Sequence, residues 1–156
     1  MGATVAALLL VAGCGSGSSS DSEVTVQTGT LSKAAFVKKA DAICEAARTE
    51  FLSKFTAFFK AHESDLGDKQ KEKVFFSEML ETTLAPNIEG EVEQMSELGA
   101  PKAYAPEVAT FLNALQKRID EAHEDPTGLT GTPYPFKKAE DVAAKVGMKG
   151  CAESFS

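Results

Sequence analysis

The chain has 156 residues, of which 43% are hydrophobic and 25% charged, and its 16 Lys and Arg against 23 Asp and Glu give a formal net charge of −7. This is the composition of an ordinary globular domain, and it excludes a disordered tail, a collagen-like repeat and a multi-pass membrane protein. The acidic balance also argues against nucleic acid as a partner, because its phosphates would be repelled.

The N-terminal segment predicts export and lipid anchoring. Residues 1–13 are uncharged and contain an apolar run from Val5 to Ala12, which is too short to cross a bilayer as a helix and is typical of a secretory signal. The sequence that ends in Gly13-Cys14 resembles the lipobox of bacterial lipoproteins. That resemblance implies cleavage before Cys14 and a diacylglyceryl group on its sulfur. We therefore expect a protein held at the extracytoplasmic face of the cell membrane.

The sequence divides into three parts. Residues 1–13 are the expected lipoprotein signal peptide, residues 14–31 a lipidated flexible tether rich in Gly and Ser, and residues 32–156 a helical domain. A secretory signal normally begins with Lys or Arg, and residues 1–13 contain neither. We therefore expect the natural translation start to lie upstream of Met1.

Two long helices are predicted at the start of the domain from apolar residues that recur every three or four positions. Ser32 is a suitable N-cap for the first, which continues to about residue 63 without a Gly or Pro. The second is expected over residues 68–98. Pro86 lies inside it and lacks the backbone N–H group of a regular helix, so a kink or break is expected there.

The rest of the domain adds two more helices. A third is predicted over residues 103–123 and a short fourth over residues 136–146, with a Gly- and Pro-rich loop at 125–135 between them. No stretch alternates with a period of two for long enough to form a sheet. The expected fold is an all-α, small antiparallel bundle of about four helices.

The number of cysteines predicts one disulfide. If Cys14 carries lipid, Cys44 and Cys151 remain, and the oxidising exterior would let them pair. Such a bridge would tie the first helix to the C-terminal tail. Two buried free thiols or a metal pair are the alternatives, although two lone cysteines without CxxC spacing make a poor metal site.

Two short segments resemble the terminal motifs of a group of small actinobacterial lipoproteins. Residues 31–44, LSKAAFVKKADAIC, are similar to the motif L-[ST]-[KR]-x-x-F-[VI]-x-x-A-[DN]-x-I-C, and residues 147–151, GMKGC, are similar to G-x-x-x-C. The resemblance implies export and a bridge between Cys44 and Cys151. It implies no catalytic residue and no established activity.

Phenylalanines gather near the turn between the first two helices. Phe51, Phe55 and Phe58 follow one face of the first helix, and Tyr134 belongs to the irregular loop at 125–135, a kind of segment that often carries recognition. These four residues are the candidate ligand-binding residues. The alternative is that the phenylalanines belong to the hydrophobic core.

Two charged features could bind cations. His62 and His123, each followed by acids, fall at the ends of the first and third helices, which meet at one end of an up-down-up bundle. They are the candidate metal ligands, and stabilisation of the helix ends is the alternative interpretation. Residues 78–97 carry six acids and no base, which indicates a solvated acidic face, or alternatively a docking surface for a cationic partner or a loose calcium site. The six are Glu78, Glu81, Glu89, Glu91, Glu93 and Glu97.

The sequence contains no nucleophile elbow, HExxH, Walker A, GxGxxG or CxxC motif, so we expect neither an enzyme nor a cofactor. The expected function is a lipid-anchored, extracytoplasmic binding or envelope-interaction module. Its partners would be the membrane, through the lipid on Cys14, and an envelope protein. The alternatives are a carrier of a small apolar ligand or lipid in a Phe-lined cavity, and a weak metal-binding protein.

Overall fold

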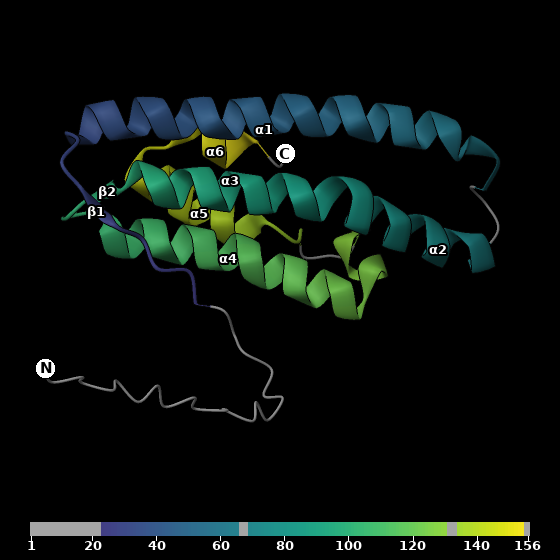
Figure 1. Cartoon of the computed structure of the whole chain (residues 1–156). Helices are drawn as coiled ribbons and strands as arrows, with labels where there is room; N and C mark the ends of the chain where they lie inside the picture. The colour runs from purple at the N-terminus through teal and green to yellow at the C-terminus, as the bar shows by residue number, and fades with distance from the viewer. Residues whose placement is uncertain (1–22, 66–68, 131–133, 155–156) are drawn as a thin grey trace, which may run out of the picture.

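The structure is a computed structural model that describes residues 23–65, 69–130 and 134–154. In it α1 runs the length of the molecule, α2 and α3 return beside it, and α4 runs back in the direction of α1 (Figure 1). The short α6 lies between α1 and α5 (Figure 1). The α-helices are α1 (Lys33–Ala61), α2 (Lys69–Met79), α3 (Ala85–Leu98), α4 (Ala105–Glu124), α5 (Lys137–Val146) and α6 (Lys149–Glu153). The predicted all-α antiparallel bundle is confirmed.

Helix α1 begins where the sequence predicts, because Ser32 accepts a hydrogen bond at its Oγ from the backbone N–H of Ala35, 3.3 Å away. Its buried residues all lie in its first half, at the helical spacing of a single face. They are Phe36, Ala40, Cys44 and Ala47. In the second half of α1, Phe51 still packs against the core, while the rings of Phe58 and Phe59 contact Phe75 of α2.

The predicted break at Pro86 takes the form of a π-helical turn. Residues Leu80–Leu84 form this turn between α2 and α3, and it closes with the N–H of Ala85 donating to the carbonyl of Leu80. Pro86 lies in the first turn of α3, where a missing N–H group has the least cost. The extra residue of a π turn moves the chain away from the carbonyl that the proline ring would otherwise strike.

Residues 23–31 lie against the bundle, so the prediction of a flexible tether over 14–31 is wrong for this part. Thr28–Gly29 (β1) pairs in parallel with Ala100–Pro101 (β2), at the end of the bundle where α1 begins (Figure 1). The N–H of Val24 donates to Oδ1 of Asn113 on α4, at 2.7 Å. The apolar residues of this segment pack against the core and account for its position; they are Val24, Val26 and Leu31. Residues 14–22, including Cys14, fall outside the described residues.

The two strands approach so closely that glycine is required. A Cβ atom at Gly29 would lie 2.5 Å from the carbonyl oxygen of Gly99, which is nearer than any real contact. Gly99 itself has a φ of 68°, a conformation that side chains other than glycine rarely adopt. The lack of a side chain at these two glycines therefore allows the N-terminal segment to lie against the end of α3.

The disulfide between Cys44 and Cys151 is confirmed. It joins α1 to α6 with Cα atoms 5.0 Å apart, and both cysteines are fully buried. Nearby, Oδ1 of Asp41 accepts hydrogen bonds from the N–H groups of Gly150, at 2.8 Å, and Cys151, at 3.3 Å. Asp41 therefore caps the N-terminus of α6 from a different helix, and the two segments that carry the terminal motifs contact each other.

Replacement of Asp41 with alanine is expected to lower the free energy of unfolding by about 0.5–2 kcal/mol, the usual cost of losing an N-cap. Asp41→Asn keeps an acceptor oxygen and should retain most of this stability. Urea unfolding would measure both. Glu45→Ala, at an exposed position one turn further along α1, is the matched control and should leave the stability unchanged. Equal stability of Asp41→Ala and wild type would contradict this role.

No helix in the part of the chain that the structure describes is long and apolar enough to span a lipid bilayer. Several helices contribute side chains to the hydrophobic core, and the largest fully buried ones include Phe36, Phe111, Leu112 and Leu115.

Candidate functional site

A cavity of about 280 Å³ lies between the second half of α1, the α2–α3 junction and the C-terminal part of the chain. Its walls are mostly aromatic and aliphatic side chains. Ligand pockets in proteins have volumes of about 300–1,000 Å³, apolar walls and a few polar groups that orient the ligand. The polar residues of this cavity are Arg48, Asn87, Glu91 and Ser154. The cavity therefore has the composition of a site for a small ligand.

Two features of the helices form the walls. Phe51 and Phe55 lie one turn apart on α1 with their rings stacked, at a centroid distance of 5.6 Å. On the opposite side, Met79 precedes the π turn and Leu84 ends it, and both are buried. Because the π turn separates α2 from α3, it brings these two side chains to one cavity that also contains Asn87 and Glu91 of α3.

The structure brings together three of the four candidate ligand-binding residues. Phe51, Phe55 and Tyr134 line the cavity, but Phe58 does not. The ring of Phe58 instead stacks on the ring of His62, at a centroid distance of 4.3 Å. Phe58 also contacts Phe75, at 5.2 Å, and so joins α1 to α2 beyond the cavity.

Tyr134 lies at the edge of the cavity with 41% of its surface exposed. Partial burial and the nearby carboxylate of Glu140 raise the pKa of its phenol to about 12. Tyr134 therefore stays neutral at physiological pH and can offer a ligand an aromatic face or a hydroxyl group.

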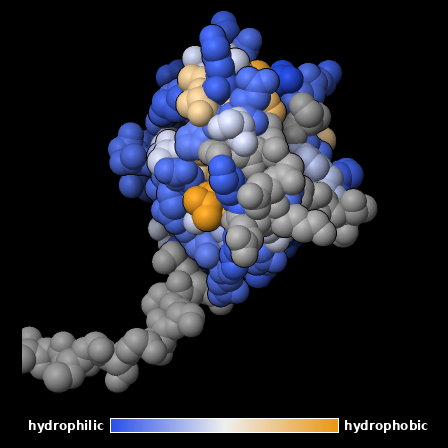
Figure 2. Space-filling view, turned by 90° about the vertical axis from the view of Figure 1, so that its right-hand side faces the viewer, coloured by the Kyte–Doolittle hydropathy of each residue, from blue (hydrophilic) through white to orange (hydrophobic). Residues whose placement is uncertain are grey.

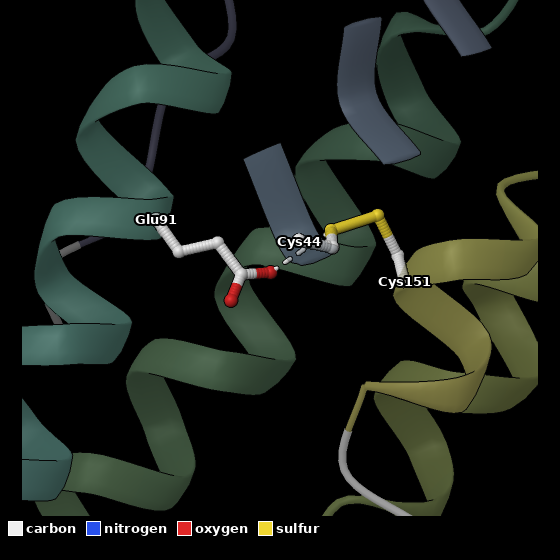
Figure 3. A group of neighbouring side chains, drawn as sticks. All are labelled: Cys44, Glu91 and Cys151. Carbon is white, nitrogen blue, oxygen red and sulfur yellow. Dashed lines mark hydrogen bonds between the residues drawn. A yellow bond between two sulfur atoms is a disulfide. The ribbon is translucent and has the colours of Figure 1, made fainter. Parts of the chain in front are cut away.

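Glu91 on α3 is the most deeply buried polar residue of the cavity, with 1% of its surface exposed. Its carboxyl points toward the disulfide between α1 and α6, and Oε1 lies 3.2 Å from Sγ of Cys44 (Figure 3). A disulfide sulfur carries no hydrogen, so in a hydrogen bond here the protonated carboxyl of Glu91 donates and the sulfur accepts. Burial raises the pKa of Glu91 to about 7, so the carboxyl keeps its proton at pH values well above those at which a glutamate usually ionises.

The prediction that all six acids of residues 78–97 form a solvated face is wrong for Glu91. A signal for its burial was present, because Glu91 follows Ile88 by three positions and precedes Met95 by four, on the apolar stripe of α3. The other five acids are exposed, as expected: Glu78, Glu81, Glu89, Glu93 and Glu97.

Each histidine lies beside a different glutamate. Nδ1 of His123, at the end of α4, lies 3.0 Å from Oε1 of Glu81, and Nδ1 of His62, just after α1, lies 3.9 Å from Oε2 of Glu78. Each pair connects a helix end to α2 or the π turn. Within the described residues, neither histidine belongs to a group of three side chains that could share a metal ion. The candidate metal site at His62 and His123 stays a prediction.

One group of three potential metal ligands is present in the described part of the chain, formed by Cys44, Glu91 and Cys151. Its two sulfur atoms are bonded to each other, and metal ions bind cysteine as the thiolate. The oxidised protein therefore cannot use these sulfurs as thiolate ligands.

No protein-family model matches the chain, and neither a curated protein nor a solved structure shows significant similarity to it. The fold and the site together define a disulfide-linked, all-α bundle with an apolar cavity. The cavity and its buried carboxyl are the features from which a function can be argued.

Proposed function

We propose that the helical domain binds a small, mostly apolar ligand in the cavity beside Phe51 and Phe55. The supporting observation is the cavity itself, which is formed within a single chain by the walls described above. Transfer of each CH₂ group of a ligand from water to such walls contributes about 0.8 kcal/mol. The lipobox-like sequence at Cys14 adds the second part of the proposal, in which a diacylglyceryl anchor holds this ligand-binding domain at the extracytoplasmic face of the membrane.

A surface for an envelope protein has less support among the described residues. Figure 2 views the end of the bundle where α1 ends and α2 begins, and the surface coloured there is largely hydrophilic with small separate apolar spots. Large hydrophobic side chains that are exposed in the described residues are few: Leu52, Phe59, Val74 and Tyr134. Interaction surfaces more often present a contiguous apolar patch. We therefore favour a small ligand over a large apolar partner surface.

Octanol is a suitable probe, because it combines an apolar chain with one neutral polar group. The full chain carrying Cys14→Ser should be used in its oxidised form, so that no attached acyl chain competes for the cavity. We expect calorimetric titration to show binding of octanol to this protein. Absence of binding up to the solubility limit of octanol would overturn the proposed function.

A pair of tryptophan substitutions tests where octanol binds. Leu129→Trp places a larger side chain in the wall of the cavity and should weaken the binding of octanol about tenfold or more. Leu52→Trp introduces the same side chain at an exposed position of α1 outside the cavity lining and should leave the affinity unchanged. The wild-type chain contains no tryptophan, so the emission of each variant also reports whether it is folded. Equal affinities of the two variants would place octanol outside this cavity.

A further inference from the structure

The cavity holds one carboxyl group away from water without a cationic partner. Glu91 lines the cavity from α3 and is 1% exposed. The contact that the described residues give its carboxyl is with Sγ of Cys44, at 3.2 Å. A disulfide carries no positive charge and has no hydrogen to donate, so this neighbour cannot stabilise the ionised form of Glu91.

The other elements around the cavity supply no charge to Glu91 either. Arg48 of α1 lines the same cavity but is exposed, and it forms no ion pair with Glu91 in the described structure. Asn87 of α3 donates from its side-chain amide to the carbonyl of Ala47, at 2.9 Å. The hydroxyl of Ser154, after α6, donates to the carbonyl of Cys151, at 2.8 Å. From the remaining elements the cavity receives apolar side chains and the neutral phenol of Tyr134; the apolar ones are Phe76, Met79, Leu84, Leu129 and Phe136.

A buried carboxylate without a partner is costly, and a cation that forms a hydrogen bond to it removes much of that cost. An alkylammonium group provides the charge and up to three N–H donors, and its hydrocarbon chain matches the apolar walls. The net charge of −7 and the exposed acids Glu89, Glu93 and Glu97 on α3 also attract cations to this part of the molecule. Resting on the proposed function, we infer that the ligand is a small apolar amine and that Glu91 is the residue that recognises its ammonium group.

The inference gives binding a defined dependence on pH. Burial raises the pKa of Glu91 to about 7, whereas an alkylamine titrates near the value of a lysine, about 10. From mildly acidic to mildly alkaline pH the amine stays charged and only Glu91 changes its protonation state. The affinity for an amine should therefore increase as the pH rises through about 7, by up to about tenfold for each pH unit below that value.

Three ligands that share the same hydrocarbon chain and differ only in the head group measure the contribution of that group to affinity. They are octylamine, octanol and octanoate. Each should be titrated into the oxidised full chain with Cys14→Ser at about pH 6 and about pH 8, on either side of the raised pKa of Glu91. We expect octylamine to bind about tenfold or more tightly than octanol at the higher pH, and this preference to shrink at the lower pH. The affinity for octanol should depend little on pH.

Two glutamine variants assign the preference to a residue. Glu91→Gln keeps the shape of the side chain and should abolish both the preference for octylamine over octanol and the pH dependence of that preference. Glu89→Gln, at an exposed position of the same helix, should retain both. If Glu91→Gln fails to fold, the ratio of octylamine to octanol affinity in the parent protein and its change with pH still test the inference.

The outcomes distinguish this inference from the proposed function. If none of the three ligands binds, the proposed function fails and the inference fails with it. If octanol binds and octylamine binds no more tightly, the cavity is a ligand site but Glu91 does not select an amine. If octanoate binds most tightly, the recognising group is a cation such as Arg48, and the inference is overturned.

Discussion

Replacement of Glu91 with glutamine is expected to raise the free energy of unfolding near pH 8 by about 3 kcal/mol and to leave it nearly unchanged near pH 4. Burial raises the pKa of Glu91 from 4.5 to about 7. As the pH rises above 4.5, the unfolded chain releases this proton while the folded protein retains it. The contribution of Glu91 to stability is therefore fully present below that pH and is lost progressively up to about pH 7. Glutamine does not ionise, so the variant avoids this loss.

Urea unfolding of wild type and Glu91→Gln across this pH range would measure the difference. The matched control is Glu89→Gln, because Glu89 lies on the same helix but is exposed. The free energy of unfolding of Glu89→Gln should change with pH in parallel with that of wild type. If the profile of Glu91→Gln also ran parallel to wild type, Glu91 would titrate normally, and the buried neutral carboxyl described here would be contradicted.

Removal of the disulfide is expected to cost about 2–5 kcal/mol of unfolding free energy. The bridge between Cys44 and Cys151 spans 107 residues, so its loss frees nearly the whole domain in the unfolded state. Both cysteines are fully buried, so the double variant Cys44→Ala with Cys151→Ala also leaves a small void. Alanine is preferred to serine here because a buried hydroxyl would add an unpaired polar group.

The measurement is urea unfolding of the double variant beside oxidised wild type. Cys14→Ala is the matched control, since it removes a cysteine that does not belong to the bridge, and it should leave the unfolding free energy unchanged. Each single variant, Cys44→Ala or Cys151→Ala, should lose most of what the double variant loses. Labelling of both thiols in the native protein, or a double variant as stable as wild type, would be incompatible with a stabilising bridge.

The disulfide and the cavity meet at one residue. Glu91 contacts the sulfur of Cys44 and also lines the cavity, so the bridge forms part of the wall that keeps its carboxyl from water. Asp41 holds the N-terminus of α6, and with it Cys151, in place on the same side of α1. The two terminal motifs of the sequence thus support the deepest part of the candidate site, which is why changes at Asp41 or the cysteines should also affect ligand binding.

The sequence by itself predicts the longer helices and the pairing of Cys44 with Cys151, but not the short α6, which it leaves in the C-terminal tail. Local signals were sufficient for the helices: a side chain that caps α1 at Ser32, Pro86 in the first turn of α3 directly after the π turn, and apolar residues at helical spacing. Pairing followed from counting, because one of three cysteines belonged to the lipobox-like segment. The clustering of aromatic residues and the irregular loop also predict Phe51, Phe55, Phe58 and Tyr134 as ligand-binding residues, and all of these but Phe58 line the cavity.

Only the tertiary structure decided which of these side chains meet. Burial depends on what covers each face of a helix, and that is set by elements distant in the sequence. Cys44 of α1 and Cys151 of α6 lie against Glu91 on the apolar stripe of α3, whereas its neighbours Glu89 and Glu93 remain exposed. In the same way, the composition of residues 23–31 predicts a tether, yet their few apolar side chains pack against the core. Their backbone bonds to Asn113 of α4 and pairs with β2. The helical spacing of Glu91 from Ile88 and Met95 indicates the buried face of α3. The cavity beside it depends on long-range packing, which leaves little trace in local periodicity.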